Sequence, residues 1–74
     1  SLFDEAMKQA REAAEIEEKA TTRFEWEQIG NKYKRASALL ASIDPKSPDF
    51  LPAREKIEVF KQKSEAAFAK MRSF

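Results

Sequence analysis

The sequence predicts an all-α protein that folds as one antiparallel, up-down-up three-helix bundle. Along three segments, apolar residues recur at steps of three and four, the period of a helix with one buried face. All three prolines lie within residues 45–52, around the boundary between the second and third segments. A chain of 74 residues is long enough for a single domain. We therefore expect one helical domain over residues 1–74, with helices at about 2–20, 23–43 and 49–72.

The first segment has an alanine-rich apolar face. Its apolar positions are Phe3, Ala6, Met7, Ala10, Ala13, Ala14 and Ala20. Alanine has the highest helix propensity, and its small side chain lets a neighbouring helix approach closely. We expect Ala10, Ala13 and Ala14 to pack against the third helix. The alternative is that they receive a helix of a partner.

Thr22 and Glu25 predict a helix start, because their spacing fits a capping box. In this motif the threonine hydroxyl and the glutamate carboxylate each accept a backbone N–H at the start of the helix. The alternative is one continuous helix from Leu2 to Ile43, since no glycine or proline forces a turn there. That helix would be about 63 Å long at 1.5 Å per residue. A partner would then have to cover its apolar face.

The second and third segments carry longer apolar stripes. They are Trp26, Ile29, Tyr33, Ala36, Leu40 and Ile43, and then Phe50, Ala53, Ile57, Phe60, Ser64, Ala67 and Met71. The second helix is expected to end at Asp44, because a residue before proline avoids the helical region. Asp49 is expected to cap the third helix, with Pro52 in its first turn, where the missing N–H is tolerated.

The composition argues against an enzyme. The chain has no cysteine and no histidine, which excludes the usual zinc sites, the thiol nucleophile and the commonest general base. Its single glycine, Gly30, excludes a glycine-rich phosphate loop. We expect no catalytic residue, no metal site and no cofactor. No apolar run approaches the roughly 18 residues that span a bilayer, and no signal-peptide pattern is present.

Charge is distributed unevenly along the chain. Residues 1–30 carry eight acidic and four basic side chains, whereas residues 31–74 carry five acidic and ten basic ones. We expect the acidic first helix to lie beside the basic last helix, and no nucleic-acid partner. The alternative is an electrostatic contact of the basic half with nucleic acid or an anionic membrane. Because the chain begins with Ser1 and not with Met, we expect it to be a fragment of a longer protein or to carry a tag remnant.

The run Trp26-Glu-Gln-Ile29-Gly30-Asn-Lys-Tyr33 resembles the opening of a tetratricopeptide repeat, which reads W-x2-L-G-x2-Y. The chain also looks like a helical-hairpin relative of that family. The alanine-rich first helix, the run Tyr33-x2-Ala36-x2-Leu39-Leu40 and the charged third helix resemble the microtubule-interacting-and-transport (MIT) domain, a three-helix bundle. Both resemblances imply a domain that holds a peptide or helix in a groove between its helices.

Seven residues are candidates for partner binding. The apolar residues Phe24, Leu39, Val59 and Phe68 fall outside or at the flank of the apolar stripes, and Lys56, Lys63 and Lys70 recur every seven residues. Off-stripe apolar residues are candidates for a partner surface, although single exposed ones are also common. The lysines could hold an acidic peptide, or they could form an ordinary solvated face.

The sequence therefore predicts a non-catalytic protein–protein interaction module, an adaptor that binds a peptide or helix in an inter-helix groove. The alternative is a structural or oligomerisation element of a larger protein, in which a second copy covers the extra apolar residues through a two-fold interface.

Overall fold

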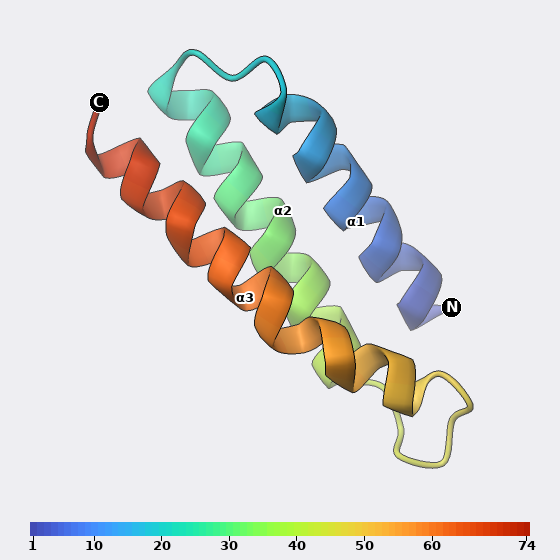
Figure 1. Ribbon diagram of the computed structural model, residues 1–74. Coiled ribbons are helices and arrows are strands. Elements are labelled where there is room, and N and C mark those ends of the chain that lie inside the picture. Colours follow the sequence, from blue (N-terminus) through green and yellow to red (C-terminus); the bar gives the residue numbers. More distant parts are fainter.

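The computed structural model describes residues 1–74 and contains three α-helices and no strand (Figure 1). They are α1 (Leu2–Glu17), α2 (Arg23–Ala41) and α3 (Phe50–Arg72). The predicted all-α, three-helix fold is therefore confirmed. The structure also has a break between α1 and α2, so the alternative of one continuous helix is wrong.

The first two helices end earlier than expected, at Glu17 and Ala41. In both cases the next residues close short turns instead of continuing the helix. The Lys19 N–H donates to the Ile16 carbonyl, and the Ile43 N–H donates to the Leu40 carbonyl. These bonds span three residues and tighten the chain after the last helical turn. Ile43 consequently stays buried although it lies outside α2.

α2 lies between α1 and α3 and packs against both, whereas the backbones of α1 and α3 hardly approach each other (Figure 1). The expectation that the acidic first helix lies beside the basic last helix is therefore wrong. The alanines of the first helix also pack on a different neighbour than expected. Ala10 and Ala13 are buried in the α1–α2 interface, while Ala14 is exposed.

The core is built around α2. Ile29 and Leu40 are its largest fully buried side chains. The ring of Tyr33 stacks on Phe60 of α3, with ring centroids 6.0 Å apart and planes inclined by 24°. Its hydroxyl donates a hydrogen bond of 3.2 Å to the Glu17 carboxylate of α1. Tyr33 thus touches both neighbouring helices while remaining only 4% exposed.

The predicted capping box at the start of α2 is present. The Glu25 N–H donates to the Thr22 hydroxyl over 3.1 Å. In return, the Glu25 carboxylate accepts the N–H groups of Thr21 and Thr22 at 2.9 and 3.0 Å. These bonds, led by the Thr21 N–H, hold the pKa of Glu25 below its usual range. Side chains of the same segment therefore accept backbone N–H groups at the start of α2.

Asp49 occupies the cap position of α3, but its side chain makes no capping hydrogen bond, so this expectation is wrong. Its backbone is already helical, with φ −85° and ψ −4°, whereas a capping side chain needs an extended backbone. The Asp49 N–H instead donates to the Ser47 hydroxyl over 3.1 Å. Pro52 does lie in the first turn of α3, as expected.

Thr22→Ala is expected to lower the free energy of unfolding by about 1 kcal/mol, because it removes the hydroxyl that accepts the Glu25 N–H. The measurement is urea unfolding followed by helical circular dichroism. Thr22→Ser keeps a hydroxyl at the same place and should unfold like the unchanged protein. Equal losses for both variants would show that the cap contributes nothing.

Burial, with the nearby Glu17 carboxylate, raises the pKa of Tyr33 to about 12. Because this is above the ordinary value of 10.0, the folded state favours the neutral phenol. The resulting stability is complete below pH 10 and is lost as pH rises from 10 through 12. Since Tyr33 is the only tyrosine, tyrosinate absorbance should report a midpoint near 12 in the folded protein.

The comparison variant for this titration is Tyr33→Phe, which keeps a ring against Phe60 but has no ionisable group. All other ionisable groups are common to both proteins, so the difference between their unfolding free energies isolates Tyr33. That difference should change between pH 10 and 12. A tyrosine midpoint at 10 in the folded protein is the result that contradicts the buried phenol.

Candidate functional site

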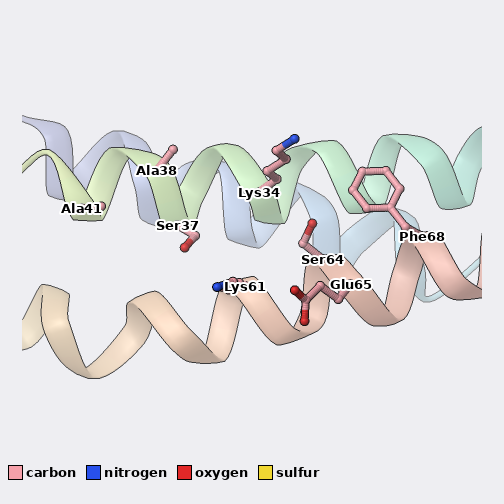
Figure 2. Close-up of a pocket in the computed structure, with 8 residues that line it drawn as sticks. All are labelled: Lys34, Ser37, Ala38, Ala41, Lys61, Ser64, Glu65 and Phe68. Carbon is pink, nitrogen blue, oxygen red and sulfur yellow. The ribbon is translucent and has the colours of Figure 1, made fainter.

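An open hollow of about 410 Å³ lies along the seam between α2 and α3 (Figure 2). We call it the α2–α3 hollow. Its walls are Lys34, Ser37, Ala38 and Ala41 from α2, and Lys61, Ser64, Glu65 and Phe68 from α3. No residue of α1 lines it, and in Figure 2 α1 passes behind α2. Its volume falls in the range of small ligand and side-chain pockets.

The seam is hollow because the facing residues are small and their polar groups are already used. The Ser64 hydroxyl donates to the Gly30 carbonyl over 2.8 Å, and this bond is buried. The Ser37 hydroxyl donates to the Ile57 carbonyl over 3.0 Å. Both bonds join α2 to α3. They leave methyl and methylene groups, with Ala38 beside them, as the surface offered to solvent.

Phe68 closes one end of the hollow by lying on Gly30. A Cβ atom at position 30 would lie 2.6 Å from Cε1 of the Phe68 ring, which is closer than atoms of this kind can approach. The absence of a Cβ at Gly30 lets the ring approach this closely, while the backbone of Gly30 is ordinary and helical. Phe68 is half-buried and is the largest apolar side chain that lines the hollow.

The rim of the hollow is charged and has no internal ion pair. Lys34, Lys61 and Glu65 are all exposed. The one ion pair of the structure joins Lys32 to Glu12 over 2.8 Å, on the α1 side of α2. Over their whole lengths both helices are basic, with four bases and two acids in α2, and six bases and three acids in α3. The lining itself carries two bases and one acid.

Of the apolar candidates from the sequence, only Phe68 lines the hollow. Phe24 and Val59 are 65% and 49% exposed and lie elsewhere. Leu39 is half-buried and packs against the core. The large apolar side chains with the greatest exposure are Leu2, Phe24, Leu51, Val59 and Phe74, and none of them lines the α2–α3 hollow. The structure does not bring the off-stripe residues together at this site.

The three candidate lysines lie outside the hollow as well. The Lys63 ammonium is 5.8 Å from the centre of the Tyr33 ring, and that of Lys70 is 5.6 Å from the Trp26 ring. These distances are within the range of cation–π attraction. Lys56 is half-buried. Lys63 and Lys70 thus lie over aromatic residues of α2.

Sequence reasoning missed most of the hollow, although a signal was present. Gly30, Ser37 and Ala41 recur at steps of seven and four along one flank of the α2 stripe. Small residues at such spacing leave room between two helices. Ser64 was expected in the third stripe, and the structure buries it facing this flank.

A smaller depression of about 230 Å³ lies where the N-terminus meets the loop between α2 and α3 (Figure 1). It is lined by Ser1, Leu2, Phe3, Ile43, Asp44, Ser47 and Asp49. Here the Asp44 carboxylate accepts the Lys46 N–H and the Ser47 hydroxyl accepts the Asp49 N–H, so polar groups are engaged in the loop itself. The ligating side chains of the protein form no group of three that could hold a metal ion. None of the three helices combines the length and hydropathy that crossing a bilayer requires.

These features define an all-α, three-helix protein with an open apolar hollow on one helix seam. Comparison with protein families, curated proteins and solved structures gives no match to this chain. The tetratricopeptide-like and MIT-like resemblances therefore remain predictions.

Gly30→Ala is expected to push the Phe68 ring away from α2 with little net change in stability. The lost contact opposes the higher helix propensity of alanine, a gain of about 1 kcal/mol. The check is a double-mutant cycle with Phe68→Ala, measured by urea unfolding. Without the ring, Gly30→Ala should stabilise the protein by the full gain. Equal effects in both backgrounds would show that the ring does not rest on Gly30.

Proposed function

We propose that this protein is a non-catalytic interaction module that binds a peptide or helix of a partner protein in the α2–α3 hollow. In this proposal the scaffold is an up-down-up three-helix bundle of the tetratricopeptide-like or MIT-like kind. The lining of the hollow supports a binding role, because it offers apolar contact and charge but no nucleophile held beside a base.

The observation that carries the proposal is the use of both serine hydroxyls inside the seam. Ser37 and Ser64 donate to backbone carbonyls of the opposite helix, so a bound apolar side chain leaves neither donor unsatisfied. Burying an unpaired hydroxyl disfavours binding, whereas covering alanine methyls and the Phe68 ring favours it. The hollow is therefore suited to an apolar anchor.

The length of the hollow supports a helical partner. Lys34 to Ala41 covers eight residues of α2, and the seven steps between them span about 10 Å at 1.5 Å per residue. Two turns of a bound helix span the same length, with anchors at i, i+4 and i+7. Lys34 and Lys61 at the rim favour acidic residues beside those anchors, because complementary charge sets specificity and association rate.

The test is selection of binders from a peptide display library on the immobilised protein, followed by affinity measurement with variants. Ala38→Glu places a charge in the hollow at an exposed helix position, so folding should be kept. It should weaken selected peptides at least about tenfold, the effect of a badly placed charge at an interface. Leu51→Ser is the matched control, since Leu51 is exposed and outside the hollow.

Two outcomes contradict the proposal. The first outcome is that no selected peptide binds, or that the selected peptides do not compete for one site, which would contradict the proposed binding function. Selected peptides that are weakened by Phe24→Ser or Val59→Ser, and not by Ala38→Glu, place binding on the other exposed apolar residues and exclude the hollow as the site.

A further inference from the structure

The α2–α3 hollow does not have the same chemistry along its whole length. The Ser37 hydroxyl is bonded to the Ile57 carbonyl, and the Ser64 hydroxyl is bonded to the Gly30 carbonyl. These two bonds fix the register of the helices, because seven residues back along α2 correspond to seven residues forward along α3. The lining residues can therefore be placed in order along the seam.

Alanine, positive charge, negative charge and an aromatic ring follow one another along the hollow (Figure 2). Two alanines of α2 lie at one end. By the register of the serine bonds, Lys34 lies about level with Lys61 on the opposite wall. Glu65 comes about one turn after Lys61 in α3, and Phe68 closes the other end.

The Phe68 ring turns one side toward α2 and keeps surface for a ligand. A Cβ atom at Gly30 would lie 2.6, 2.7 and 2.8 Å from Cε1, Cδ1 and Cζ of the ring. These distances are nearly equal, so the ring lies broadside on Gly30, because an edge-on ring would bring one carbon much closer than its neighbours. Phe68 is half-buried and lines the hollow, so part of the ring stays open to it.

We propose that the partner of the α2–α3 hollow is a helix with an aromatic anchor that stacks on Phe68. This inference rests on the proposed function and names the chemistry of the partner. Aromatic pairs gain attraction beyond the apolar area that they bury, so an aromatic side chain is favoured over an aliphatic one at this end. The Phe68 ring already lies against Gly30 before binding, so little of its freedom is lost when a second ring stacks on it.

The charged residues of the rim select the residues beside the anchor. Lys34, Lys61 and Glu65 are exposed and form no ion pair, so all three are free to meet a partner. A bound helix that lies along α3 has the same rise per residue. It therefore places a basic residue about one turn from the aromatic anchor, facing Glu65, and an acidic residue about two turns from it, facing the two lysines.

The test is selection from a peptide display library built on a helical scaffold, with the positions of one helix face randomised. A selected peptide counts as a hollow binder only if Ala38→Glu weakens it at least about tenfold. Among hollow binders, aromatic residues should be enriched at one end of the face, with a base about one turn and an acid about two turns away. Hollow binders without an aromatic preference overturn this inference and leave the proposed function standing, whereas a library without hollow binders removes both.

A double-mutant cycle tests whether the anchor stacks on Phe68. Replacing the aromatic residue of a selected peptide by leucine should lower its affinity for the unchanged protein about two- to tenfold, the scale of an aromatic pair. With Phe68→Leu, which keeps a large apolar side chain, the same replacement should have little effect. Val59→Leu, at an exposed position outside the hollow, is the control and should preserve the full loss. Equal losses with Phe68→Leu and with the unchanged protein would rule out stacking on this ring.

Charge reversal at the rim gives a second measurement, which leaves the apolar lining intact. Glu65→Lys changes an exposed side chain, so folding should be kept. It should weaken peptides with a base beside the anchor and strengthen the same peptides with glutamate at that position. Glu15→Lys makes the same change of charge on α1, which does not line the hollow, and should leave the preference unchanged. A preference that Glu65→Lys does not change, or that Glu15→Lys changes equally, overturns the proposed order of charges.

Discussion

The fold depends on one constraint, which is that α2 must pack against two helices that hardly contact each other. Tyr33 contacts both of these helices with a single side chain. Its ring packs on Phe60 of α3 and its hydroxyl reaches Glu17 of α1, while Lys63 lies over the same ring. A domain of this size buries a small fraction of its chain, so contacts shared between helices matter more than in a larger protein. Loss of Tyr33 would affect both interfaces at once.

The two interfaces of α2 are built differently, and this difference gives each its property. Toward α3, serine hydroxyls on both helices donate to carbonyls of the opposite one, and Phe68 rests on Gly30. These contacts fix the distance between α2 and α3 and leave a hollow of defined shape. Toward α1 the packing uses buried alanines, the half-buried side chains of Phe3, Met7 and Ile16, and two polar contacts made by Lys32 and Tyr33. The alanines let α1 lie close to α2, so this interface has no comparable hollow.

The sequence predicted the structural features that are set by residues close together along the chain. Helix number, the start of α2 at Thr22 and the proline-containing loop all follow from residues within one or two turns of each other. The choice of helix neighbours did not follow, because apolar periodicity shows which face is buried but not against which helix. The acidic and basic halves suggested a pairing of α1 with α3, yet side-chain packing on α2 outweighed that long-range attraction, which water and salt screen. The hollow was missed for a related reason. The spacing of Ser37 and Ala41 marks a flank of small residues, but these residues form a site only because α3 packs along them, which the spacing does not show.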